Sequence, residues 1–244
     1  MSGPIGIPDV VDALAAALRA ILGDRLVAVY LGGSFSMGDF VDGVSDYDVL
    51  VVTAAPLSSA ELDAIRARLE KLRAEHPDAD RLEGDLAPRD WLRPEGTTRP
   101  VPFFVDGRLQ PKPELMLSAD NIANIRQDGI VVFGPPPGDV LPAVSSDQVR
   151  AAVREMLDDE DDCSTEQEAA AAAVDLVRGH HALRTGMPTT KSDGLRWASG
   201  VLGPSWQPLL QQADAARRGG LVAADGRIFR DGVAQLRVAL DELA

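Results

Sequence analysis

The stretch Leu-Gly-Gly-Ser-Phe-Ser-Met-Gly at residues 31–38, followed by Ser-Asp-Tyr-Asp-Val-Leu-Val-Val at residues 45–52, decides the fold. Asp46 and Asp48 stand two positions apart at the head of an apolar strand, so their side chains point to the same face. Two carboxylates on one face can share one or two hard divalent cations such as Mg²⁺, which prefer oxygen ligands. The alternative is a capping and turn cluster over residues 42–46 that binds no metal.

Gly33 and Ser34 follow a β-rich run over residues 25–31 and are expected to begin a short helix over residues 35–40. A helix N-terminus offers free N–H groups and a partial positive charge, which favour a bound phosphate. Glycine leaves those N–H groups uncovered, and the serine adds a hydroxyl. An ordinary tight turn between a strand and a helix is the alternative, and the Asp pair favours the phosphate site.

The hydrophobic pattern of the first half predicts strands and helices in alternation. That order predicts an α/β (α+β) domain built around a small mixed sheet. A proline-rich stretch at residues 134–138 ends this part and is the best domain boundary. The expected strands are residues 25–31, 46–53, 80–86, 101–105 and 130–133, and the expected helices are 9–22, 35–40, one opened by Ser58 or Ser59, and 118–128.

The second half carries helical patterns alone, including an Ala-rich run with high helix propensity over residues 166–184. The sequence therefore predicts a first domain over residues 1–143 and an all-α helical-bundle domain over residues 144–244. The expected helices of the second domain are residues 146–157, 166–184, 191–201, 205–217 and 226–243.

Composition narrows the class of protein. The 244 residues are 45% apolar and 25% charged, which is typical of a globular chain. The formal charge of −14 argues against a general affinity for nucleic acid, whose phosphates would be repelled, and favours cationic small molecules or simply solubility. We expect no membrane span and no signal peptide, and the single cysteine, Cys163, fits a reducing cytoplasm.

The Gly-Ser turn followed by the Asp-x-Asp pair resembles the signature of the DNA polymerase β-type nucleotidyltransferase superfamily. In such enzymes a third carboxylate completes the metal site or acts as general base on the acceptor hydroxyl. Glu83 on the third expected strand is the candidate, because the context Arg81-Leu82-Glu83 favours it over Asp85, two residues on along the same face. The alternative is a solvent-facing acidic strand end.

A wider resemblance covers most of the chain. It is to the streptomycin/spectinomycin adenylyltransferases, the aminoglycoside 3''/9 O-nucleotidyltransferase family. It rests on motifs in both halves and on their spacing. The matching positions are Gly33-Ser34, Asp46, Asp48, Leu82-Glu83, residues 130–135, Arg178, Thr185-Gly186, Lys191, Trp197-Ala198 and residues 202–208.

The resemblance implies that ATP binds with Mg²⁺ and that Glu83 is the catalytic base. It also implies that the helical domain supplies Arg178 and Lys191 to the phosphates. Lys191 follows the helix-breaking segment Gly186-Met187-Pro188 and precedes a helix, so it can reach a triphosphate as a point charge. A solvated helix charge is the alternative. The implied metal ligands are Asp46, Asp48 and Glu83, and the implied phosphate-binding residues are Gly33, Ser34, Arg178 and Lys191.

The resemblance is weaker on the acceptor side. Glu168 stands where the family presents an aspartate to the drug. The family's aromatic contact to streptomycin falls here in an acidic patch, residues 158–162, which has no aromatic residue. That patch either attracts a polycation or is a solvated helix end. Residues 88–113 also match the family poorly.

Together these patterns predict a cytoplasmic two-domain monomer with its active site between the domains. The predicted reaction is Mg²⁺-dependent transfer of AMP from ATP to a hydroxyl of an aminoglycoside or aminocyclitol, with release of pyrophosphate. The expected partners are ATP and a cationic small-molecule acceptor, without nucleic acid or membrane. Two alternatives stay open, namely a nucleotidyltransferase acting on a protein or another metabolite, and a non-catalytic nucleotide-binding module.

Overall fold

The computed structural model describes residues 6–112, 116–158, 165–220 and 226–243, the last range without the side chains of residues 226–230. The chain forms two compact units. The first comprises Met1–Phe40 and Ser45–Val144, and the second comprises Val41–Val44 and Ser145–Ala244. A compact unit does not have to fold independently, so the two domains expected over residues 1–143 and 144–244 stay a prediction.

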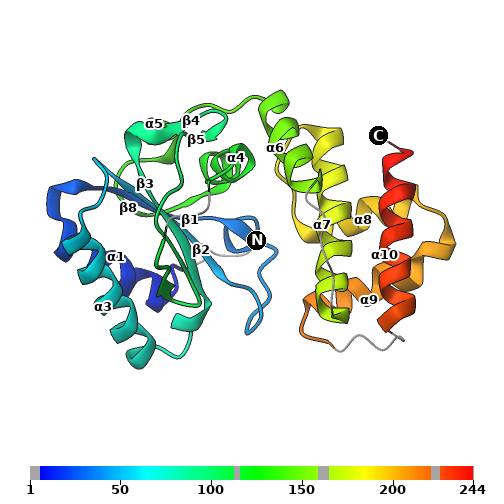
Figure 1. The fold of residues 1–244 in the computed structure, drawn as a ribbon, viewed down its shortest axis with the longest axis horizontal. Helices are drawn as coiled ribbons and strands as arrows, with labels where there is room; N and C mark the ends of the chain where they lie inside the picture. The colour runs from blue at the N-terminus through cyan, green and yellow to red at the C-terminus, as the bar shows by residue number, and fades with distance from the viewer. Residues whose placement is uncertain (1–5, 113–115, 159–164, 221–225, 244) are drawn as a thin grey trace. The chain divides into compact units, whose positions relative to one another are not determined.

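Six strands of the described residues form one mixed sheet in the first unit, in the order β7-β6-β3-β2-β1-β8 (Figure 1). β2 and β3 are parallel, and the other neighbours are antiparallel. The sheet confirms the predicted fold class. The strands are β1 Leu26–Leu31, β2 Tyr47–Thr53, β3 Leu82–Pro88, β6 Phe103–Val105, β7 Arg108–Leu109 and β8 Ile130–Phe133.

Helices cover both faces of this sheet (Figure 1). α1 (Asp9–Leu22) and α3 (Ser59–Glu75) pack on one face, while α4 (Ala119–Asp128) and α5 (Pro137–Val140) pack on the other. Because side chains alternate along a strand, odd-numbered residues of β2, and of β1 from Ala28 onward, face α1 and α3, while even-numbered ones face α4 and α5. The first set includes Val29, Leu31, Val49 and Val51, and the second includes Ala28, Tyr30, Leu50 and Val52.

The local boundaries correct several expectations. The short helix is α2, Gly33–Ser36, rather than residues 35–40. Its first backbone hydrogen bond runs from the Ser36 N–H to the Gly32 carbonyl oxygen, at 3.3 Å, so the helix begins earlier than expected. The third strand, expected over residues 80–86, is β3 and is preceded by the 3₁₀ turn η2 (Ala79–Arg81).

The long excursion after β3 contains more structure than its Pro-rich and Gly-rich sequence indicates. Beyond the expected strand at residues 101–105, observed as β6, it holds β7 and a small separate hairpin of β4 (Leu92–Arg93) and β5 (Gly96–Thr97). The proline-rich stretch at residues 134–138 leads into the helical turn α5, Pro137–Val140, because proline is compatible with the first helical positions.

The regular secondary structure in the described residues of the second unit is entirely helical, as the sequence predicts. Its longest helix, α7, begins at a capping box in which Thr165 and Glu168 satisfy each other's backbone N–H groups, and it ends at Gly186 in the left-handed conformation. Alanines make up much of its buried face, so neighbouring helices approach closely. The helices are α6 Ser146–Asp158, α7 Glu166–Thr185, α8 Lys191–Val201, α9 Gln207–Arg217 and α10 Gly226–Asp241.

Among the described residues, no helix combines the length and the apolar character needed to cross a membrane.

The sheet is tightly packed around Gly84, the residue that follows Glu83 on β3. A Cβ on Gly84 would lie 2.2 Å from the Val49 carbonyl oxygen and 2.6 Å from Cζ of Phe104. We expect Gly84→Ala to lower the free energy of unfolding by about 1–3 kcal/mol, because neither a strand backbone nor a buried ring yields easily. Urea unfolding measures the change. Gly200→Ala is the control, since its Cβ would meet no atom within 4 Å; equal stability of the two variants would contradict the packing.

Candidate active site

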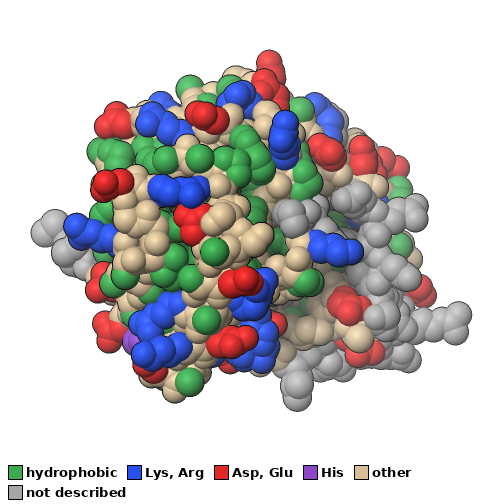
Figure 2. Space-filling view, turned by 60° about the vertical axis from the view of Figure 1, so that its left-hand side comes forward, with side chains coloured by type: hydrophobic (Ala, Val, Ile, Leu, Met, Phe, Trp, Pro, Cys, Tyr) green, Lys and Arg blue, Asp and Glu red, His purple; other side chains and the backbone are tan. Residues whose placement is uncertain are grey.

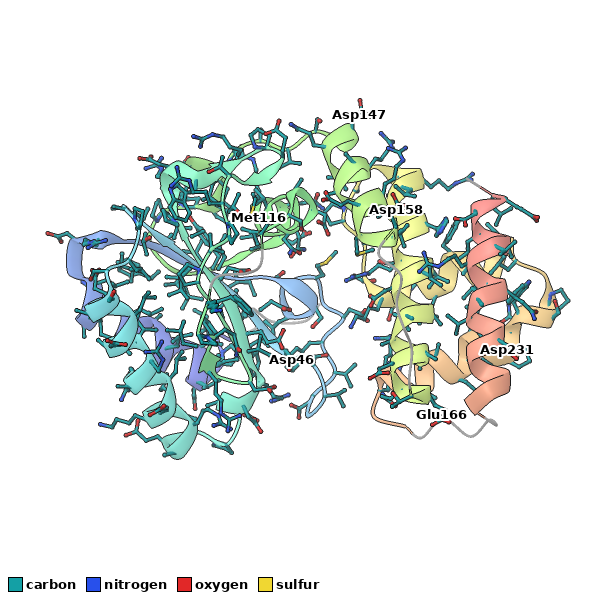
Figure 3. The ribbon with its side chains drawn as sticks, in the orientation of Figure 1. Asp46, Met116, Asp147, Asp158, Glu166 and Asp231 are labelled. Carbon is teal, nitrogen blue, oxygen red and sulfur yellow. The ribbon has the colours of Figure 1, made fainter. Side chains whose placement is uncertain are left out.

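Four carboxylates gather on one face of the sheet where β2 and β3 begin. In the parallel register Asp48 lies beside Glu83, and Leu50 lies beside Asp85. Asp46 precedes Asp48 by two residues, directly before β2, as Figure 3 shows. The period-two alternation therefore directs all four side chains toward the face that α4 and α5 cover farther along the strands. Sequence reasoning placed Asp46, Asp48 and Glu83 together, and the fold brings them to one edge.

Gly33 is packed directly against Asp48. A Cβ on Gly33 would lie 1.8 Å from Oδ2 of Asp48 and 2.5 Å from its Cγ. Gly33 also has φ +58°, a conformation that residues with a side chain rarely adopt. The Gly32 N–H donates to the Asp48 carbonyl oxygen at 2.8 Å, so the turn and the strand are joined through the backbone as well. The glycine is thus required for the position of the Asp48 carboxylate.

Asn124 is a site residue that sequence reasoning missed. Its Oδ1 accepts the Gly33 N–H at 3.0 Å, and the residue is only 8% exposed. The Gly33 N–H therefore bonds to α4, and the expectation that it is free to bind a phosphate is wrong. What Gly33 contributes is the absence of a side chain, which leaves room for the Asp48 carboxylate. The sequence holds one weak sign of this role: Asn124 is a polar residue on the same helix face as the apolar Ile122 and Ile125.

The clustered carboxylates make proton release unfavourable. Burial, followed by the charges of Asp46, Asp48, Asp106 and Asp85, raises the pKa of Glu83 from 4.5 to about 7. Burial and the charge of Asp48 raise the pKa of Asp85 from 3.8 to about 6. Both shifts have the sign expected for buried like charges. Metal-free, this edge of the sheet is a region of concentrated negative potential.

The donor set suits a magnesium ion shared with a substrate. No group of three His, Cys, Asp or Glu side chains in the described residues is arranged to hold a metal by itself. Mg²⁺ commonly takes one or two carboxylates from the protein and fills its other positions with substrate phosphates and water. The Asp46–Asp48 pair meets that requirement, and the crowded negative charge favours a cation there. A ligand role for Glu83 stays a prediction.

In the second unit, Arg178 lies half-buried on α7, with its Nη2 3.1 Å from Oδ1 of Asp175. Lys191 is the exposed first residue of α8. A Cβ on Gly194 would lie 2.7 Å from the Arg178 Cα, so the first turn of α8 packs closely against α7 at Arg178. The fold therefore places the two predicted phosphate-binding cations on adjacent helix segments of one unit.

The predicted acceptor residue Glu168 has a structural use. Its Oε2 accepts the Thr165 N–H at 3.0 Å, as the third residue of the capping box. Asp158 ends α6 and Glu166 begins α7 (Figure 3), and the rest of the acidic patch, residues 159–162, lies outside the described residues. On the face drawn in Figure 2, acidic and basic side chains are interspersed.

Comparison with known proteins agrees with this geometry. Residues 12–89, which include β1, α2, β2 and β3, match the nucleotidyltransferase domain family. This match confirms the predicted enzyme class, a nucleotidyltransferase. No curated protein sequence is significantly similar to the chain.

The likeness of fold extends over the whole chain. The structure of spectinomycin adenyltransferase AAD(9) from Enterococcus faecialis, solved with ATP and spectinomycin, is similar with a TM-score of 0.73. The likeness covers 96% of this chain and 98% of that one, at 15% sequence identity. It shows that both proteins share the fold.

The raised pKa values predict how stability depends on pH without metal. Between the unfolded and folded pKa values of Glu83, 4.5 and about 7, the folded state holds more protons than the unfolded state. Stability must therefore fall as pH rises through this window. With a chelator present, urea unfolding at pH 5 and pH 7.5 measures the fall. Asp46→Asn should reduce it and the exposed control Asp63→Asn should not; a fall that is the same in both variants would refute the charge cluster.

The contact between Gly33 and Asp48 predicts a steric effect on nucleotide binding. Gly33→Ala should displace the Asp48 carboxylate and weaken binding of Mg²⁺–ATP by about tenfold or more, as measured by calorimetry. Gly38→Ala is the matched control, because Gly38 also has positive φ, +74°, but no atom lies within 4 Å of its Cβ position. Equal binding by the two variants would contradict an effect of the clash with Asp48.

Proposed function

We propose that this protein transfers AMP from ATP to a hydroxyl of a cationic aminocyclitol or aminoglycoside and releases pyrophosphate. The observation that carries the proposal is the position of the Asp48 carboxylate, held against the side-chain-free Gly33 and beside Glu83 in the parallel register. It gives one edge of the sheet both a pair of metal-binding carboxylates and a third carboxylate for the acceptor.

Each residue has a distinct part in the proposed reaction. Glu83 accepts the proton of the acceptor hydroxyl, whose oxygen bonds to the α-phosphorus as the bond from that phosphorus to the β-bridging oxygen breaks. Asp46 and Asp48 would hold Mg²⁺, which supplies neutralisation of charge on the phosphates. Gly33 keeps the floor of the site open for the triphosphate, and Ser34 offers it a hydroxyl.

The helical unit is proposed to complete the nucleotide site. Arg178 and Lys191, on adjacent segments of α7 and α8, supply positive charge to the phosphates, as they are the cations at the positions of the family resemblance. Glu168 is proposed to face the acceptor as well as cap α7. We propose that the protein acts as a monomer in the cytoplasm.

Charge supports a cationic acceptor. Glu83 is surrounded by Asp46, Asp48, Asp85 and Asp106, whose charges all act on it. A neutral or anionic acceptor would gain nothing from this potential, whereas an amine-bearing ring would be attracted to it. The shared fold with an enzyme whose structure holds ATP and spectinomycin supports the same class of acceptor.

Pyrophosphate release from MgATP tests the proposal. The wild-type protein is assayed with streptomycin, spectinomycin, other aminoglycosides and no drug. We expect drug-dependent release, and we expect Glu83→Gln to slow it by at least about 100-fold through loss of the base. Asp48→Asn should slow it by a similar factor through loss of charge neutralisation. Asp63→Asn, an exposed carboxylate on α3, is the control and should match wild type.

The outcomes separate the alternatives. ATP binding without release in the presence of any drug would reject the antibiotic acceptor and favour a protein or metabolite acceptor, or a nucleotide-binding module without catalysis. Full activity of Asp48→Asn would remove Asp48 from the mechanism. Release that persists unchanged in Glu83→Gln would assign the base to another group.

A further inference from the structure

The guanidinium of Arg81 joins the strand that carries Glu83 to the segment that carries Asp46. Arg81 is the last residue of η2, directly before β3, and its side chain is 13% exposed. Its Nη1 donates to the Ser45 carbonyl oxygen at 3.3 Å, and its Nη2 donates to the Tyr47 hydroxyl oxygen at 3.1 Å. The acceptors belong to the residues on either side of Asp46, so Arg81 holds the Ser45 backbone before it and the Tyr47 side chain after it.

Aromatic contacts strengthen this connection. The Arg81 guanidinium carbon lies 5.6 Å from the ring centre of Phe40 and 4.9 Å from that of Tyr47, within the range of cation–π attraction. The Phe40 and Tyr47 rings are stacked at 5.1 Å, and Phe35 meets Phe40 edge-on at 5.1 Å. Phe35 belongs to α2 and Tyr47 begins β2, so Arg81 and the three rings tie together the two ends of the connection that delivers Asp46.

Asp78 orients the same guanidinium. Its Oδ1 lies 2.9 Å from Nη2 of Arg81 on the same short turn. The Asp78 side chain is half exposed, so this ion pair contributes little stability by itself. Its effect is geometric, because it fixes the plane of the fork that reaches Ser45 and Tyr47.

Only arginine among the cationic side chains can make this set of contacts. Its planar fork presents five N–H donors in fixed directions while its face stacks on aromatic rings. A lysine ammonium is a compact point charge and would keep at most part of the set. The chemistry of the contacts therefore specifies arginine rather than positive charge in general.

We propose that Arg81 is a positioning residue that holds Asp46 in register with Asp48 and Glu83. The proposal rests on the proposed function for the use made of these carboxylates, but the positioning itself does not depend on which acceptor is modified. Because β2 and β3 start side by side, with Tyr47 paired to Leu82, a bond across their beginning sets how far the Asp46 carboxylate lies from that of Glu83.

The test compares Arg81→Lys with Arg66→Lys. Arg66 is an exposed arginine of α3 that pairs with Asp63 outside the carboxylate cluster, so it is a matched control. Three quantities are measured: Mn²⁺ binding in the presence of ATP by electron paramagnetic resonance, kcat and KM for pyrophosphate release, and amide hydrogen exchange of residues 45–48. We expect Arg81→Lys to lower Mn²⁺ affinity and kcat by about 10–100-fold, the range found when a partner of a metal ligand is removed.

KM for the acceptor should stay unchanged in Arg81→Lys, and exchange at residues 45–48 should become faster, while Arg66→Lys matches wild type throughout. Tyr47→Phe keeps the ring and removes one acceptor, so it should shift Mn²⁺ affinity and exchange in the same direction by a smaller factor. It also carries the test if Arg81→Lys does not fold, in which case wild-type values in Tyr47→Phe would overturn the proposal.

A folded Arg81→Lys protein with wild-type Mn²⁺ affinity, kcat and exchange at residues 45–48 overturns the proposal. So does a variant that loses only thermal stability, since that result assigns Arg81 a purely structural role. If the wild-type protein releases no pyrophosphate with any acceptor, the proposed function fails; the exchange rates and Mn²⁺ binding of the two variants then still decide the role of Arg81.

Discussion

The close packing of Gly33 against the Asp48 carboxylate is the constraint on which the rest of the site depends. It requires that the residue after Gly32 have no side chain, and it requires β1 and β2 to be antiparallel neighbours so that the turn after β1 reaches the head of β2. The Gly32 N–H bond to the Asp48 carbonyl oxygen fixes the same approach through the backbone. Once these contacts form, the position of one carboxylate is determined by the fold rather than by a flexible side chain.

Placing several carboxylates on one sheet edge has an electrostatic cost. Burial and like charges hold the pKa of Glu83 and of Asp85 above the ordinary range. A fold selected only for stability would favour apolar residues there, because burying several like charges together is unfavourable. A bound cation would offset this cost. Residues 12–89, which contain these carboxylates, match the nucleotidyltransferase domain family.

Two polar side chains outside the signature support its geometry. Asn124 reaches from α4 to the Gly33 N–H, and Arg81 reaches from the start of β3 to the residues on either side of Asp46. Each bonds to a backbone group next to the carboxylates, and Arg81 also bonds to the Tyr47 hydroxyl. Neither is adjacent in sequence to the residue it contacts, and single-chain patterns report only local spacing. Sequence spacing therefore indicates neither as a site residue, although Arg81 belongs to the local context that favours Glu83.

The sequence by itself determined the elements whose signals are local. Strand alternation placed Asp46 and Asp48 on one face, the Gly-Gly-Ser turn marked the end of β1, and helical periodicity indicated an all-α second half. Tertiary structure alone decided which strands pair and in what register, since β2 and β3 are parallel neighbours only because α3 connects them over the sheet. It also decided that the Gly33 N–H bonds to Asn124 and that Arg81 reaches Ser45 and Tyr47. These outcomes depend on contacts between residues far apart in the chain, and no periodicity of the sequence encodes them.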